Sequence, residues 1–185
     1  SICDHIGSCP PSGSASFGLF SQTEDGPTVT NTTTETSIMG TGVGTLQVKA
    51  NQFKVGDSFH LKMAGYFSFS SGDDIRFRGK ADGVTLFDTD EHRLYNSEGD
   101  VWVLMCDFTI RQIGAAGTAS LFTTGNFVYS TEDIDSEYKR GFSFRSLNNT
   151  TFDTTIDNTL DITVEWSQAS SDDSITSQMG ILNKI

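Results

Sequence analysis

The sequence predicts an all-β protein made of two stacked antiparallel sheets, and residues 158–166 show the pattern most clearly. In this segment every second residue is apolar and the residues between are polar, as expected for a strand whose successive side chains point to opposite faces of a sheet. The apolar positions are Leu160, Ile162, Val164 and Trp166, and the polar ones are Asp161, Thr163 and Glu165. One face of this strand is therefore expected in a dry interior and the other in water.

Turn-forming combinations separate the predicted strands at short intervals, which is typical of a sandwich or barrel and leaves little room for helices. Glycine in these combinations supplies backbone angles that other residues avoid. The turns are expected at Gly40–Gly42, Lys54–Asp57, Ser71–Asp73, Asp82–Gly83, Glu98–Asp100 and Gly114–Gly117.

The predicted strands run from Ala15 to Lys184. The Thr-rich segment Thr28–Met39 is included because β-branched residues favour extended backbone. The other strands are expected at Ala15–Gln22, Val43–Val48, Ser58–Ser70, Asp74–Gly79, Val84–Asp88, Val101–Ile113, Thr118–Ser130, Gly141–Leu147, Asn158–Gln168 and Ser174–Lys184. The acidic segment Thr131–Arg140 is expected to form either one helical turn or a loop.

Aromatic residues, 14 of them Phe, are the natural filling for the space between the sheets. The expected core consists of Phe53, Phe59, Leu61, Phe67, Phe69, Phe77, Trp102, Phe108, Phe127, Phe144 and Trp166.

Charge and length restrict the partners and the domain organisation. With 12 Lys and Arg against 24 Asp and Glu the formal net charge is -12, which repels nucleic-acid phosphates and anionic lipids. No apolar run is long enough for a membrane helix, so membrane insertion is not expected. The 185 residues suit one domain, predicted at 15–185, after a tether or linker rich in Ser, Gly, Pro and Cys at 1–14.

The three cysteines carry different expectations. Cys106 lies in an apolar run and is expected to be a buried free thiol. Cys3 and Cys9 flank a short loop, where they form a disulfide, link neighbouring chains or stay free, and the sequence does not choose among these. Their spacing matches no usual zinc pattern, and no cofactor is expected.

Four segments together resemble a family of jelly-roll proteins encoded by phages and large DNA viruses. They are Gly42–Val48, Asn51–Gly65, Asp107–Gly117 and Asn148–Ile162, and the resemblance extends from about Ala15 to the end of the chain. It implies a tumour-necrosis-factor-like jelly roll, often trimeric, that forms the head of a virion spike, fibre or tail appendage. The acidic stretch Asp88–Asp100 departs from the family pattern.

The resemblance favours a non-enzymatic virion structural protein at the virion surface or outside the cell. Such a protein would form a homotrimer, contact other virion proteins through its tether, and attach the virion to a host surface glycan or receptor. Two other classes stay open: a secreted or surface carbohydrate-binding module, and a glycan hydrolase. No acid and base pair and no nucleophile motif is singled out, so no catalytic residue is proposed.

Two apolar runs suggest a subunit interface. Val101–Phe108 is apolar enough to be buried on both faces, and the segment Met179–Leu182 is similar. The interface candidates are Val101, Val103, Met179, Ile181 and Leu182. The alternative is that both runs lie wholly in the core of one chain.

The acidic stretch holds the remaining candidate site residues. Asp88, Asp90 and Glu91 offer carboxylates for a calcium loop, although their spacing fits no complete calcium motif and a solvated turn is the simpler interpretation. Tyr95, with Arg93 and Asn96 beside it, is the candidate ligand contact, because an exposed aromatic ring can stack on a sugar.

Overall fold

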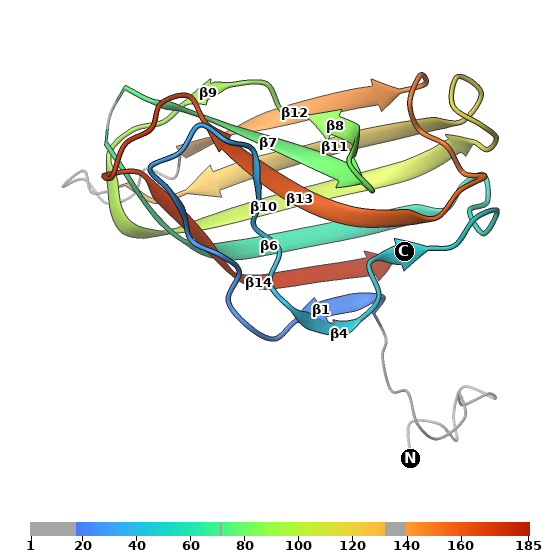
Figure 1. The fold of residues 1–185 in the computed structure, drawn as a ribbon, viewed down its shortest axis with the longest axis horizontal. Helices are drawn as coiled ribbons and strands as arrows, with labels where there is room; N and C mark the ends of the chain where they lie inside the picture. The colour runs from blue at the N-terminus through green and yellow to red at the C-terminus, as the bar shows by residue number, and fades with distance from the viewer. Residues whose placement is uncertain (1–17, 71, 132–139) are drawn as a thin grey trace, which may run out of the picture.

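The computed structural model describes residues 18–70, 72–131 and 140–185, and within them the protein is all-β (Figure 1). These residues contain no helix, and therefore none that could cross a membrane. Two antiparallel sheets pack as a jelly-roll-like sandwich, which confirms the predicted fold class. The predicted tether at 1–14, with Cys3 and Cys9, lies outside the described residues, as does most of the segment Thr131–Arg140.

The larger sheet has eight strands in the described part, and its two longest, β6 and β10, are neighbours. The spatial order is β12 (Arg140–Asn148), β11 (Ser120–Tyr129), β10 (Ser97–Gln112), β6 (Ser58–Phe69), β14 (Ser174–Lys184), β1 (Phe20–Gln22) and β4 (Gly42–Gly44), with β2 (Val29–Thr30) paired to β14. The last strand along the chain is thus an interior strand of this sheet.

The smaller sheet has six strands among the described residues. Its order is β3 (Thr36–Ser37), β13 (Asn158–Trp166), β7 (Asp74–Ala81) and β8 (Val84–Asp88), with β5 (Gln47–Val48) paired to β13 and β9 (His92–Arg93) paired to β7. A two-residue loop, Asp82–Gly83, joins β7 to β8 with φ angles of 47° and 86°. Positive φ at both loop positions matches the twist of a tight hairpin.

The predicted alternation in β13 is confirmed, because Leu160, Ile162, Val164 and Trp166 are all buried. Every residue that the sequence placed in the core is buried as well. Phe127 lies at the centre, with its ring centroid 4.9–6.2 Å from those of five other aromatic residues. These are Phe67, Phe77, Trp102, Tyr129 and Phe142. Phe77 belongs to the smaller sheet and the others to the larger one, so this cluster joins the two layers.

Both buried indoles have hydrogen-bond partners. Trp102 Nε1 donates to the carbonyls of Tyr66 (3.1 Å) and Thr176 (3.2 Å), and Trp166 Nε1 donates to the carbonyl of Val29 (3.2 Å). A buried N–H without an acceptor would cost stability, so these bonds allow tryptophan to lie fully inside.

A buried amide, that of Asn148 at the end of β12, links the two sheets at one edge. Its Nδ2 donates to the carbonyls of Thr85 (3.0 Å) and Leu86 (3.2 Å) in β8 of the other sheet. Its Oδ1 accepts from the backbone N–H groups of residues 150–152 at 3.1–3.2 Å. One side chain therefore shapes the turn after β12 and holds it against the smaller sheet.

The segment Thr28–Met39, predicted as one strand, forms two short strands in different sheets. β2 pairs with β14 of the larger sheet and β3 with β13 of the smaller one, and Asn31 between them has a φ of 49°. Residues 43–48 divide in the same way between β4 and β5. A chain that crosses from one layer to the other cannot continue pairing with either, so the extended prediction for these segments is wrong.

Within one chain Val101–Phe108 is buried on one face only, so the alternative that this run lies wholly in the core of one chain is wrong. In β10 only alternate residues are buried, and Val101 is 60 % exposed, because the smaller sheet covers one face of β10 alone. Cys106 lies on the covered face as a free thiol, as expected, and burial raises its pKa.

We expect Phe127→Ala to lower the free energy of unfolding by about 3 to 5 kcal/mol, because it removes the ring that contacts both layers and leaves a cavity. Val55→Ala is the control, since Val55 is 63 % exposed in a turn and should change stability by no more than about 0.5 kcal/mol. Urea unfolding followed by tryptophan fluorescence measures both. Equal effects of the two substitutions would contradict the central role of Phe127.

Candidate functional site

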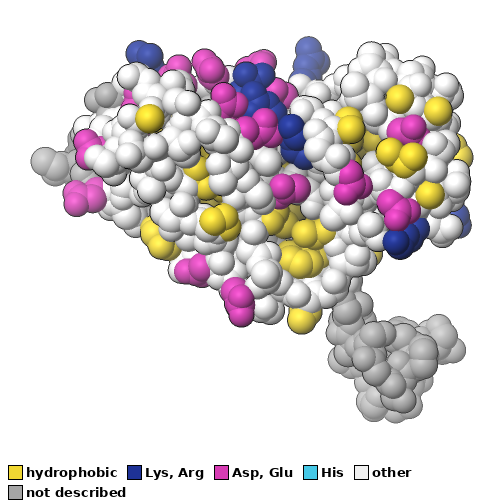
Figure 2. All heavy atoms as spheres, viewed as in Figure 1, with side chains coloured by type: hydrophobic (Ala, Val, Ile, Leu, Met, Phe, Trp, Pro, Cys, Tyr) yellow, Lys and Arg dark blue, Asp and Glu magenta, His cyan; other side chains and the backbone are white. Residues whose placement is uncertain are grey.

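The outer face of the smaller sheet carries a network of paired charges. The guanidinium of Arg78 contacts the carboxylates of Glu35 (3.0 Å), Asp88 (3.1 Å) and Glu165 (2.5 Å). Arg76 forms a two-pronged pair with Asp88 at 2.6 and 2.7 Å. In the upper part of Figure 2, Lys and Arg side chains lie beside Asp and Glu side chains. The charges of this face are therefore balanced within the face.

The pKa values of the carboxylates follow from this pairing. Burial acts against the charged form of Glu35, but hydrogen bonds from Lys80 and Thr163 outweigh it and lower the pKa of Glu35. Burial opposes ionisation of Asp88 too, and the hydrogen bond from Arg76 lowers its pKa. Both groups stay ionised at neutral pH and act as counter-ions.

The predicted calcium loop is not assembled. Asp88 is taken up by Arg76 and Arg78, while Asp90 donates its backbone N–H to Asp88 Oδ1 at 2.9 Å. The described residues contain no group of three or more Asp, Glu, His or Cys side chains placed to hold a metal ion. With Asp88 already paired to two arginines, Asp88, Asp90 and Glu91 do not form a ligand set.

The outer face of the larger sheet is different, because a row of apolar side chains crosses four of its strands. Met179 of β14 pairs with Ala64 of β6, Ala64 with Val103 of β10, and Val103 with Val128 of β11. The exposed face of an antiparallel sheet normally carries polar residues. We call Met179, Ala64, Val103 and Val128 the apolar row.

Other apolar residues flank the apolar row. Ile181 lies two residues after Met179 in β14 and therefore on the same face. On the opposite side of the row, Val101 pairs with Tyr66, which is 40 % exposed. Four of the five interface candidates, Val101, Val103, Met179 and Ile181, thus belong to one outer face. Leu182 does not, because it is buried in the core opposite Leu61, and this candidate is wrong.

The predicted ligand contacts divide between two hollows. Arg93 and Tyr95 line a hollow of about 360 Å³ together with Arg140 and Phe142 of β12. Asn96 lines a separate hollow of about 330 Å³ beside Glu98. Arg93 donates to Asp74 Oδ1 at 3.1 Å and is therefore neutralised.

Several stacked side chains form the wall of the first hollow, which we call the Tyr95–Arg140 hollow. The guanidinium carbon of Arg140 lies 3.8 Å from the Tyr95 ring centroid, and the His92 and Phe142 rings stack at 3.8 Å. The backbone N–H of Tyr95 donates to the Tyr129 hydroxyl at 3.1 Å. Sequence reasoning missed Arg140 and Phe142. A signal was visible in the sequence, because Arg140, Phe142 and Phe144 are spaced by two residues and therefore belong to the same face of a strand.

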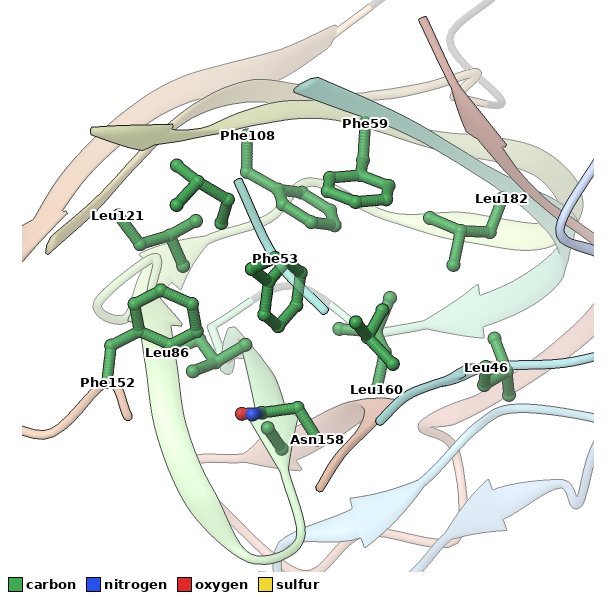
Figure 3. Close-up of a pocket in the computed structure, with 13 residues that line it drawn as sticks. Leu46, Phe53, Phe59, Leu86, Phe108, Leu121, Phe152, Asn158, Leu160 and Leu182 are labelled. Atoms are coloured by element: carbon green, nitrogen blue, oxygen red, sulfur yellow. The ribbon is translucent and has the colours of Figure 1, made fainter. Parts of the chain in front are cut away.

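A cavity inside the sandwich offers no binding site. It measures about 30 Å³ and is almost wholly apolar, with Phe53, Phe59, Phe108 and Phe152 pointing into it (Figure 3). This volume is far below the roughly 300 Å³ at which pockets for small molecules begin, and apolar walls give a water few partners. The cavity is a packing defect of the core.

Two carboxyl groups, those of Asp73 and Asp173, lie close together at one end of the sandwich. Asp73 directly precedes β7, and Asp173 directly precedes β14. Asp173 is fully buried, its Oδ1 accepts from the backbone N–H of Ser70 at 3.2 Å, and its Oδ2 has no donor among the described residues. Burial, followed by the hydrogen bond to Asp73 and repulsion from Asp73 and Asp172, raises the pKa of Asp173 to about 7. Asp173 therefore holds a proton at pH values below about 7.

Comparison of the chain with protein-family models, with curated proteins and with solved structures finds no match. The fold and its surfaces define the class: a jelly-roll-like β-sandwich with paired charges on one outer face, an apolar row across the other, and a basic, aromatic hollow at its rim.

We expect stability to fall as pH rises from 5 to 8, with Asp173 responsible. Its folded-state pKa lies above the ordinary value of 3.8, so the native state binds the extra proton and loses this stabilisation as pH rises towards and through about 7. Urea unfolding at several pH values measures the slope. Asp173→Asn, which keeps the acceptor and cannot ionise, should flatten the slope. Glu91→Gln is the control, because Glu91 is exposed and is not among the groups that act on Asp173. An unchanged slope in Asp173→Asn would rule Asp173 out as its source.

Proposed function

We propose that this chain is a non-enzymatic virion structural protein, the head of a spike or fibre or a surface decoration, that assembles as a homotrimer. The apolar row on the outer face of the larger sheet carries the proposal. The virion setting and the number three rest on the resemblance to tumour-necrosis-factor-like jelly rolls of viruses. Attachment to a host surface is the activity that such a head would serve.

Charge explains why a second copy of the chain is the expected partner for the apolar row. A net charge of -12 makes two copies repel each other wherever their acidic surfaces meet. The apolar row contains no charged residue, so contact there brings no like charges together. Contact there also removes apolar side chains from water, which favours association by roughly 25 cal/mol for each Å² of apolar surface that is buried.

The opposite outer face is unsuited to this role. Arg78 and its three carboxylates already satisfy one another, and burying them in an interface would remove them from water without new partners. The difference between the faces therefore supports assembly through the larger sheet.

The Tyr95–Arg140 hollow supports a second candidate function, that of a secreted or surface carbohydrate-binding module. Tyr95 is 54 % exposed beside a guanidinium, and this combination suits a polar ligand with a flat apolar face. A module of this kind would bind as a monomer, so the oligomeric state separates the two candidates. A glycan hydrolase remains a third class, which requires turnover that depends on one carboxylate.

We expect the protein in solution to have three times the mass of one chain and to resist dilution to micromolar concentration. Val103→Asp places a charge in the apolar row and should give the single-chain mass, because an unpaired charge buried in an interface is costly. Val84→Asp, the same change in β8 of the smaller sheet, should leave the trimer intact. Light scattering after size-exclusion chromatography measures all three.

Urea unfolding of both variants shows whether each domain still folds. A wild-type protein that is monomeric at micromolar concentration would overturn the proposed assembly, as would a trimer unaffected by Val103→Asp in a folded variant.

A further inference from the structure

Arg140 breaks the pattern of its own strand. In β12 the inward phase holds Phe142, Phe144, Ser146 and Asn148, and Arg140 is the one charged residue in this phase, opposite Tyr129 of β11. A charged side chain in the apolar phase of a strand costs stability unless it is compensated. Departures of this kind from the local rule are concentrated at functional sites.

No acidic partner compensates Arg140 in the described part of the chain. Its Nε is buried without a hydrogen-bond acceptor among the described residues, and its guanidinium lies against the ring of Tyr95. Of the eleven described Lys and Arg residues five have no carboxylate partner, and among these five only Arg140 has a buried nitrogen without a hydrogen-bond acceptor. Six other basic side chains have a carboxylate oxygen within 3.1 Å. They are Lys49, Arg76, Arg78, Lys80, Arg93 and Lys184.

The hollow beside Arg140 has room for a small ligand. It measures about 360 Å³, and a second hollow of about 390 Å³ shares Arg140, Gly141 and Phe142 with it. Pockets for small molecules begin at about 300 Å³. A planar guanidinium recognises a carboxylate through two parallel N–H···O bonds, and stacking on Tyr95 holds the guanidinium plane in place.

We propose that the Tyr95–Arg140 hollow binds a carboxylate-bearing saccharide. The guanidinium of Arg140 would pair with the carboxylate, and the aromatic wall would cover the apolar face of the sugar ring. A saccharide fits better than an acidic peptide because the hollow joins exposed aromatic surface to one cation that has no acidic partner in the described part of the chain. A peptide with several carboxylates would meet the chain's own negative charge. This inference rests on the attachment role in the proposed function and names its ligand class.

Calorimetry with two matched ligand pairs tests the proposal. The pairs are a glucuronate-containing tetrasaccharide with its carboxyl-reduced form, and sialyllactose with lactose. We expect at least one acidic member to bind, and its neutral counterpart to bind about tenfold more weakly or not at all, since one charge-assisted pair is lost.

Variants of β12 locate the binding site. Arg140→Gln should weaken binding of the acidic member by about tenfold or more, and Arg140→Lys, which keeps the charge without the planar fork, should lie between. Arg145→Gln is the matched control, because Arg145 is exposed on the outward phase of the same strand and should bind as the wild type does. Thermal unfolding confirms that each variant is folded.

Three results would overturn the inference: no binding of either acidic saccharide, equal binding of acidic and neutral members, or unchanged binding in folded Arg140→Gln. Tighter binding of a Glu-rich octapeptide than of either saccharide would overturn the ligand class. Mass measured on the same samples separates the two proposals, since a trimer without saccharide binding refutes this inference alone, and a monomer that binds refutes the assembly alone.

Discussion

Exclusion of water from the space between the two sheets is the constraint on which the rest of the structure depends. The ring of Phe127 contacts aromatic residues of both layers, and no inward position near it can carry an unpaired polar group without loss of stability. The paired arginines of β7 and the apolar row lie on the outer faces, and the Tyr95–Arg140 hollow lies at the rim. Where a polar group is buried, as at Asn148, hydrogen bonds to the backbone compensate it. Among the described residues Thr123, Arg140 and Asp173 depart from this rule, because each has one buried polar atom without a partner.

The longer strands could be predicted because their signal is local. Alternation within β13 and the turn Asp82–Gly83 depend only on neighbouring residues, and both were found from the sequence. The role of Asn148 could not be predicted, because its partners Thr85 and Leu86 lie about sixty positions earlier in the chain. The same reason explains the error in Thr28–Met39, where pairing with two different sheets overrides an extended pattern.

The candidate sites were predicted only in part, for related reasons. Arg93 and Tyr95 were singled out as loop residues, yet the hollow is completed by Arg140 and Phe142, which pairing of β12 with β11 brings to the same rim. Asp88 looked like a metal ligand because the neighbouring acids are visible in the sequence and its arginine partners on β7 are not. Leu182 lies in the interior because a bulge between Ser177 and Met179 shifts the phase of β14.

The position of β14 has a consequence for how the protein is made. β14 contains residues 174–184 yet lies between β6 and β1, both of which are synthesised much earlier. Until β14 has emerged from the ribosome, the nascent chain exposes the open backbone edges of β6 and β1, which invite pairing with other chains. The larger sheet can be completed only after residues 174–184 have emerged, and the interval before that is when a chaperone would be most needed.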